Sequence, residues 1–264
     1  MSKFLEVCEQ AARAGGRVLL DWQGKFAIRE KGPSDLVTEA DLAAQQEVKR
    51  ILLGQFADHA FLGEEGFGSE PEGYEYRWIV DPLDGTVNYV HGLSNYCVSV
   101  ALERRGELLA ATIFAPESNE CYTAEAGQGA WLNGRPIRTS ACRDLSQALV
   151  AASFPPQTRR GDPELEDFIE VLQGCRAIRR FGSAALNLCY VAAGKLDGFW
   201  STNIHIWDVA AGILLVREAG GKVASLNDSP VDMADPKFIS AATPQLFAAL
   251  RRQLPSARTS AVRS

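Results

Sequence analysis

The feature that most constrains the fold is the run WIVDPLDGTVNYVHG (78–92), which passes from an apolar strand into two acid-bearing turns. The run RWIV (77–80), apolar from Trp78 onwards, predicts a short buried strand. Pro82 has no N–H to give to a sheet, so we expect the strand to end at Asp81. The turn that follows would bring the carboxylates of Asp81 and Asp84 to the end of one buried strand.

The second half of the same run adds groups that suit a charged ligand. The carbonyl of Leu83 lies between the two acids as a further oxygen donor. Gly85 permits a close backbone approach, and Thr86 begins a helical turn whose N–H groups can bind an anion. Acids beside an anion repel it unless a divalent cation lies between them. Asp-Pro and Asp-Gly are also common turn formers, so a plain turn is the alternative for this motif taken alone.

Three further acids stand at the ends of predicted elements: Glu64 after a strand, and Asp41 and Asp208 at the starts of helices. Taken singly, each has an ordinary explanation. Glu64 can be an exposed loop acid, because most acids are solvated. Asp208 can cap its helix, and Thr38 or Asp41 can cap the helix that begins there.

Hydrophobic periodicity predicts the remaining elements. We predict helices at 1–22, 38–56, 164–175, 183–194, 208–221 and 244–254. We predict strands at 59–63, 77–80, 95–103, 108–115, 120–124, 129–132, 149–154, 197–202, 222–226 and 238–242. The strands between 95 and 132 should form an antiparallel meander, and Asn133-Gly134 marks a tight hairpin turn.

This order of elements predicts a mixed α and β fold in layers, with no linker at which to divide it. We expect one compact catalytic unit over 1–264. Its N-terminal α+β half, 1–145, would hold the antiparallel sheet, and 146–254 would form a C-terminal α/β half. Residues 255–264 have no apolar face, so we expect a disordered tail there.

Composition restricts the partners and the compartment. The net charge of −6 argues against direct nucleic-acid binding and fits cations held by carboxylates. No stretch approaches the ~20 apolar residues of a membrane span, and the N-terminus lacks the pattern of a secretion signal. The six cysteines form no Cys-x-x-Cys pair, and the three histidines share no zinc-ligand spacing with them. We expect a cytoplasmic protein with reduced thiols and no membrane partner.

The acidic segments together resemble the inositol monophosphatase family, through WIVDPLDGTVNYVHG (78–92), WDVAAGILLVREAGG (207–221), GEE (63–65) and DLVTEAD (35–41). The resemblance runs from about Asp35 to Gly221. It implies a layered αβαβα sandwich of the inositol monophosphatase/sugar phosphatase type and a homodimer. It also implies lithium-sensitive hydrolysis of phosphate monoesters that depends on two or three Mg²⁺ ions per active site.

The same resemblance implies a role for each matching residue. One Mg²⁺ would be held by Glu64, Asp81 and the Leu83 carbonyl. A second would be held by Asp81, Asp84 and Asp208, and a loosely bound third would lie near Glu64. The catalytic residues would be Glu64 and an Asp41–Thr86 pair that orients and deprotonates the attacking water. Substrate contacts would come from Asp84, Gly85, Thr86, Ser183, Ala184, Ser201 and Asp208. Two metals ~3.5–4 Å apart can bind the attacking and leaving oxygens of an in-line displacement.

The choice of substrate is the open part of this interpretation. Family members that prefer inositol commonly carry a glutamate shortly before the WD motif, where this chain has Ser201. A neutral hydroxyl cannot give the same charge-assisted hydrogen bond. Ser183 and Ala184 resemble small pocket-wall residues, although Ser183 can equally cap a helix. Inositol monophosphate is the leading candidate, and a sugar phosphate, histidinol phosphate or a nucleotide are alternatives. A role of another class, as a partner of the transcription or RNA-processing machinery, is implied by some bacterial members.

Overall fold

The computed structural model describes residues 1–264 apart from 26–27, 33–34, 67–72, 155–157 and 261–264. Its helices are α1 (Lys3–Trp22), α2 (Glu39–Gln55), α3 (Thr86–Val90), α4 (Pro163–Gly174), α5 (Ala184–Ala192), α6 (Ile206–Glu218), α7 (Pro244–Gln253) and α8 (Pro255–Ser260). Its strands are β1 (Ile28–Gly32), β2 (Asp35–Thr38), β3 (Ala60–Gly63), β4 (Tyr76–Asp84), β5 (Cys97–Arg104), β6 (Glu107–Ala115), β7 (Glu120–Glu125), β8 (Gly129–Leu132), β9 (Arg135–Pro136), β10 (Leu149–Ala152), β11 (Ala177–Arg179), β12 (Gly198–Ser201), β13 (Lys222–Ser225) and β14 (Phe238–Ala241).

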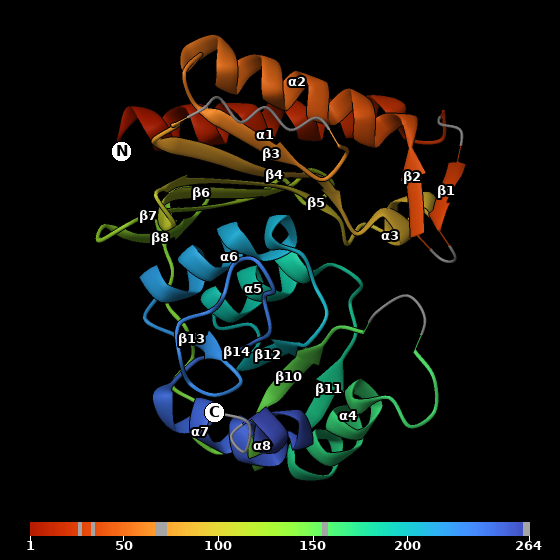
Figure 1. The fold of residues 1–264 in the computed structure, drawn as a ribbon, viewed down its shortest axis with the longest axis vertical. Coiled ribbons are helices and arrows are strands. Elements are labelled where there is room, and N and C mark those ends of the chain that lie inside the picture. Colours follow the sequence, from red (N-terminus) through yellow and green to blue (C-terminus); the bar gives the residue numbers. More distant parts are fainter. Residues whose placement is uncertain (26–27, 33–34, 67–72, 155–157, 261–264) are drawn as a thin grey trace.

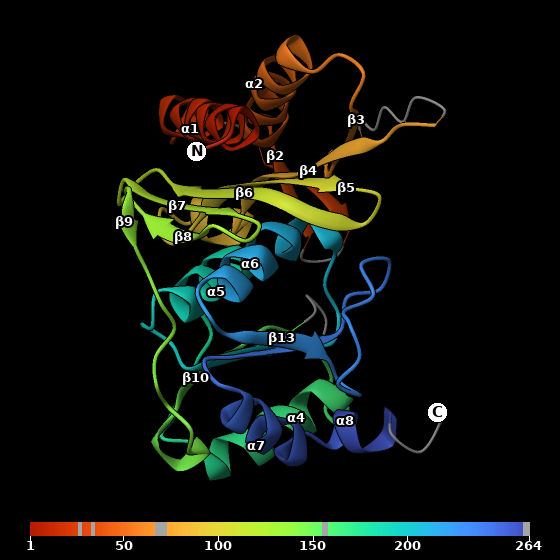
Figure 2. The ribbon, with the colours of Figure 1, turned by 90° about the vertical axis from the view of Figure 1, so that its left-hand side faces the viewer.

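These elements stack in five layers, which Figures 1 and 2 show from two sides. Helices α1 and α2 cover a seven-stranded sheet of order β3-β4-β5-β6-β7-β8-β9. Helices α5 and α6 form the middle layer. Below them lies a five-stranded sheet of order β11-β10-β12-β14-β13, covered on its outer face by α4, α7 and α8. The layered αβαβα arrangement expected from the sequence is therefore confirmed.

The seven-stranded sheet contains the predicted antiparallel meander from β5 onwards, and only β3 pairs with its neighbour β4 in parallel. Asn133 and Gly134 both have positive φ at the β8–β9 turn, as the hairpin prediction requires. The Thr38 side chain accepts a hydrogen bond from the N–H of Ala40, and Asp41 accepts one from the N–H of Thr38. This capping box fixes the start of α2. The sequence did not indicate the β1–β2 hairpin that precedes it.

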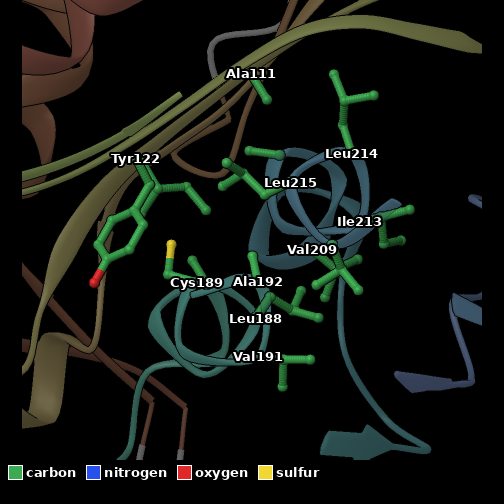
Figure 3. Close-up of a cluster of buried hydrophobic side chains, with 14 of the residues drawn as sticks. Ala111, Tyr122, Leu188, Cys189, Val191, Ala192, Val209, Ile213, Leu214 and Leu215 are labelled. Carbon is green, nitrogen blue, oxygen red and sulfur yellow. The ribbon is translucent and has the colours of Figure 1, made fainter. Parts of the chain in front are cut away.

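The middle layer is apolar on nearly all sides because α5 and α6 lie between two sheets (Figure 3). Figure 3 shows Leu188, Cys189 and Ala192 of α5 next to Val209 and Leu215 of α6, with Tyr122 of β7 reaching in from the larger sheet.

Gly212 allows the two helices to approach closely. A Cβ atom at this position would lie 2.5 Å from the Cβ of Leu188. Both helices begin near Asp84, which accepts the Ala185 N–H at the start of α5 and has a carboxylate oxygen within 4.8 Å of one of Asp208 in the first turn of α6.

Part of the expected disordered tail, Pro255–Ser260, forms helix α8, and the rest of that prediction, 261–264, lies outside the described residues. Ser256 donates hydrogen bonds from its N–H and its hydroxyl to the two carboxylate oxygens of Asp167 in α4, at 2.9 and 2.5 Å. Ala257 is buried in the apolar cluster beneath the smaller sheet. A buried carboxylate partner far away in sequence thus orders a segment that lacks an amphipathic pattern. In the described part of the chain, no helix is both long and apolar enough to cross a membrane.

Candidate metal centre

Three carboxylates converge where the seven-stranded sheet meets the middle helical layer. Asp81 and Asp84 come from the end of β4, and Asp208 comes from the first turn of α6. One carboxylate oxygen of each lies within 4.8 Å of the others. Asp81 and Asp84 are buried, and Asp208 is partly exposed. Carboxylate oxygens this close form a donor set for a hard divalent cation such as Mg²⁺.

The strand that carries the first two acids does not end at Asp81, so that prediction is wrong. β4 continues to Asp84 through an irregular step: Asp81 pairs with Ser99 of β5, and Asp84 pairs with Cys97. The two residues between them have no partner residue on β5, and Pro82 is one of them, so its missing N–H costs no ladder hydrogen bond. The bulge leaves Asp81 and Asp84 within reach of one cation.

Asp84 is held by the beginning of α5. Its Oδ2 accepts hydrogen bonds from the Ser183 hydroxyl at 2.5 Å and from the Ala185 N–H at 2.7 Å, and its Oδ1 accepts from the Ala184 N–H at 3.3 Å. The Cys97 thiol lies 3.8 Å from Oδ2. The exposed N–H groups at a helix start carry partial positive charge and stabilise a carboxylate. Asp84 is thus fixed by a helix that begins a hundred residues later in the chain.

Local backbone groups orient the other two acids. The Leu83 N–H donates to Asp81 Oδ1 at 2.9 Å, and the His205 N–H donates to Asp208 Oδ2 at 2.9 Å. Asp208 is therefore not the N-cap residue of α6. His205 occupies the N-cap, and Asp208 is the third helical residue, where it accepts the N–H of the cap.

The electrostatics show that the three acids repel one another. Burial raises the pKa of Asp81 well above its ordinary value, with further contributions from Glu64, Asp84 and Asp208. Burial followed by the charge of Asp84 raises the pKa of Asp208 to about 8. Burial also raises the pKa of Asp84, although the bonds from Ser183 and the α5 backbone oppose the shift. A cation between these groups would relieve the repulsion.

Glu64 directly follows β3, as predicted, but it lies outside the group of three converging carboxylates. Its charge still contributes to the raised pKa values of Asp81, Asp208 and Asp41. The Glu64 N–H donates to the Val80 carbonyl at 3.2 Å, which ties this turn to β4.

Gln45 of α2 also holds this turn, and the sequence analysis did not single it out. It is buried, and its Oε1 accepts the N–H of Glu65 at 3.1 Å. Its position one helical turn after Asp41 is the only signal that links it to the site.

The structure places Asp41 and Thr86 in separate hydrogen bonds. Asp41 Oδ2 accepts from both the hydroxyl and the N–H of Thr38, at 2.5 and 2.8 Å. Its Oδ1 is buried without a hydrogen-bond partner among the described residues. The Thr86 hydroxyl instead donates to the Leu83 carbonyl at 3.0 Å. Burial raises the pKa of Asp41 to about 7.

Gly85 forms the link between the acids and α3. Its φ is +96°, in the left-handed region, and a Cβ atom here would lie 2.8 Å from the Asn95 carbonyl oxygen. Both facts favour glycine at this position. Thr86 then begins α3, which confirms the predicted helical turn.

Three of the seven residues expected to contact the substrate are nearly inaccessible. Ser183, Ala184 and Ser201 are 1%, 7% and 1% exposed. The Ser183 hydroxyl caps α5 by accepting the Leu186 N–H at 3.2 Å while it donates to Asp84. Ser201 ends β12, and its buried hydroxyl has no hydrogen-bond partner in the part of the chain that the structure describes.

Comparison with known proteins shows which family shares this layered fold. The sequence matches the Inositol monophosphatase family over residues 1–258. It is 43% identical over 224 residues to an inositol-1-monophosphatase of Rhizobium meliloti, covering 83% of this chain and 84% of that protein. It is 38% identical over 238 residues to the Nus factor SuhB of Pseudomonas aeruginosa, covering 87% of this chain and 88% of that protein.

Among solved structures, the extragenic suppressor protein suhB of Bartonella henselae superposes with a TM-score of 0.91 at 40% identity. The match covers 96% of this chain and 99% of the other. The chain therefore belongs to the inositol monophosphatase family. It is a phosphoric monoester hydrolase.

Proposed function

We propose that this protein hydrolyses a small phosphate monoester in the presence of Mg²⁺, with inositol monophosphate as the leading substrate. The observation that carries the proposal is the convergence of Asp81, Asp84 and Asp208 within 4.8 Å in a buried setting. Such a set of like charges is unfavourable by itself and favourable around a cation.

The donor set fits Mg²⁺, because all of its atoms are hard oxygens. Asp81, Asp84 and Asp208 would hold the ion, and we propose that Glu64 and the Leu83 carbonyl complete the site for two or three ions. Bound Mg²⁺ supplies positive charge that activates water and stabilises the leaving oxygen. The hydrogen bonds from Ser183 and the α5 backbone keep Asp84 in one orientation.

Asp41 is our candidate for the group that takes the proton of the attacking water. Its pKa of about 7 suits proton transfer near neutral pH, and Thr38 fixes the carboxylate through Oδ2. This arrangement leaves Oδ1 as the acceptor. We propose that Thr86 orients the water after its hydroxyl leaves the Leu83 carbonyl, and that the N–H groups of Gly85 and Thr86 contact the phosphate.

A preference for inositol over other alcohols would have to rest on uncharged groups of this chain. At position 201 the chain offers a buried hydroxyl in place of a carboxylate, so no charge-assisted bond to a ring hydroxyl arises there. Ser183 and Ala184 donate hydrogen bonds to Asp84, so we assign them to positioning this metal-binding carboxylate rather than to contact with the inositol ring. Sugar phosphates, histidinol phosphate and nucleotides are the competing substrates.

A phosphate-release screen over these monoesters, with and without Mg²⁺, tests the proposal. We expect turnover that requires Mg²⁺ and is highest with inositol monophosphate. The matched control is Asp84→Asn, which keeps the size of the side chain and removes its charge; we expect turnover at least about 10²-fold lower. A folded Asp84→Asn protein with near-normal turnover would contradict the site, and a different best substrate would overturn the inositol assignment alone.

A second candidate function is association with the transcription machinery, and the name of the Pseudomonas aeruginosa relative, Nus factor SuhB, favours it. Capture of transcription proteins by this chain, compared between wild type and Asp84→Asn, separates the two roles. Equal capture by both would indicate a role independent of catalysis. We also propose a homodimer, to be measured by sedimentation.

A further inference from the structure

A second charged site lies at the far end of the molecule from the acid cluster. A hollow of about 290 Å³ opens beside α7, α8 and the start of β13. Helices α7 and α8 cover the outer face of the smaller sheet, whereas α5 and α6 cover its inner face (Figures 1 and 2). The smaller sheet and the middle helical layer therefore separate this hollow from the larger sheet, which carries Asp81 and Asp84.

The hollow gathers positive charge on a chain whose net charge is −6. Its lining includes four cationic side chains and one acid: Lys222, Arg251, Arg252, Arg258 and Asp228. Lys222 pairs with Asp228 at 2.6 Å. The three guanidinium groups have no carboxylate partner among the described residues. Like charges gathered around one hollow repel each other unless an anion joins them.

Backbone carbonyls fix two of these guanidinium groups. Arg251 donates from Nε to the Leu226 carbonyl at 2.9 Å, and Arg258 donates from Nε to the Arg252 carbonyl at 2.8 Å. Arg251 therefore keeps its terminal amino groups for a ligand. Arginines in the last turn of a helix are also favoured by the helix dipole, which accounts for Arg251 and Arg252. The dipole of α8 likewise favours Arg258 in the last turn of that helix, but no helix dipole accounts for Lys222, which reaches the same hollow from β13.

The single acid of the hollow occupies an unusual backbone position. Asp228 has a φ of +71°, a conformation that costs energy in any residue other than glycine, although Asp and Asn tolerate it better than most. Its carboxylate holds Lys222, whose Nζ lies 4.2 Å from the ring centre of Phe247 at the floor of the hollow. The lysine is thus kept in place beside the unpaired arginines.

We propose that this hollow binds a small anion that carries one or two phosphate groups, at a site separate from the metal centre. The planar guanidinium fork matches phosphate oxygens in pairs. The volume is at the lower end for small-molecule sites, which admits inorganic phosphate, pyrophosphate or a compact phosphorylated metabolite and excludes a dinucleotide.

Calorimetric titration of the full-length protein in EDTA, with inorganic phosphate and separately with pyrophosphate, tests the proposal. Without metal the acid cluster repels both probes, so the titration reports on the basic hollow. We expect saturable one-site binding that weakens at least about tenfold in Arg251→Gln/Arg252→Gln. The matched control Arg104→Gln/Arg105→Gln removes the same charge from the β5–β6 turn, and we expect its affinity to change by less than about twofold.

A variant that is expected to bind more tightly controls for misfolding, because a misfolded protein would bind more weakly. Asp228→Asn removes the one repulsive charge, leaves a side-chain oxygen that can still accept from Lys222, and keeps a residue that tolerates positive φ, so we expect binding about threefold tighter or more. Asp235→Asn removes an exposed acid outside the hollow and should leave affinity unchanged.

Three results would overturn the proposal. The first is the absence of saturable binding of either probe up to about 10 mM. The second is an equal loss of affinity in the two double-arginine variants, and the third is a lower affinity of Asp228→Asn than of the wild type. Phosphatase turnover should stay within about twofold of wild type in all of these variants, because none of them contacts the acid cluster. A failed titration with intact turnover would refute this site and leave the proposed function standing.

Discussion

Replacing Asp208 with asparagine should change the stability of this protein in opposite directions with and without Mg²⁺. Without metal, the carboxylate of Asp208 lies against Asp81 and Asp84 in a desolvated cluster. Asparagine keeps the shape and can still accept the N–H of His205, but it carries no charge. The variant should therefore be more stable than wild type in EDTA and gain little from Mg²⁺.

The magnitude follows from protonation. The pKa of Asp208 is raised from 3.8 to about 8, whereas the unfolded chain has an ordinary carboxyl pKa. Protonated Asp208 contributes to the free energy of unfolding, and this contribution is fully present below about pH 4 and is lost as the pH rises through about 8. Each pH unit of this window corresponds to about 1.4 kcal/mol, so the cost of the wild-type carboxylate at pH 8 reaches at most about 5 kcal/mol.

Urea unfolding at pH 5 and pH 8, in EDTA and in Mg²⁺, measures the effect. In EDTA at pH 8 we expect Asp208→Asn to be about 2–5 kcal/mol more stable than wild type, and at pH 5 only about 1 kcal/mol. Mg²⁺ should raise the free energy of unfolding of the wild type, because the ion binds only the folded protein. The increase should be much smaller for Asp208→Asn.

The control is Asp167→Asn, which removes a buried carboxylate that bonds Ser256 far from the cluster. Its effect on stability should be the same in EDTA and in Mg²⁺. Lower stability of Asp208→Asn than wild type in EDTA at pH 8 would refute the reasoning, because it would mean that the three acids do not repel one another.

Three further predictions test the surroundings of the cluster. Ser183→Ala removes the hydroxyl that holds Asp84, so Mg²⁺ affinity and kcat should fall about tenfold with KM little changed, and Ser183→Thr should restore both. Gly85→Ala should cost about 1–3 kcal/mol in thermal unfolding, whereas Gly24→Ala, also at positive φ but with nothing within 4 Å, should cost less. Lithium at tens of millimolar should inhibit turnover by occupying one Mg²⁺ site, and unchanged rates would count against a shared cation site.

The local structures around the candidate site that the sequence predicted correctly depend on short-range chemistry. Asp81 and Asp84 are three residues apart on either side of one bulge, and the Thr38 cap of α2 is set within three residues. The strand end at Asp81 was predicted wrongly because Pro82 was expected to stop the sheet, whereas a bulge accommodates it. The α8 helix was missed because its partner, Asp167, is 89 residues away.

The anchoring of Asp84 shows why the remainder required a structure. Its partners Ser183 and Ala185 are 99 and 101 residues away, and each by itself is explained by helix formation. Their role exists only because α5 and α6 lie between two sheets and begin at the end of β4. The apolar pattern of both helices is visible in the sequence, but which sheet end they meet depends on the packing of both layers. The cation site is therefore a product of the layer order: the starts of α5 and α6 supply N–H groups that hold Asp84 and Asp208, and the repulsion that remains is what a cation would remove.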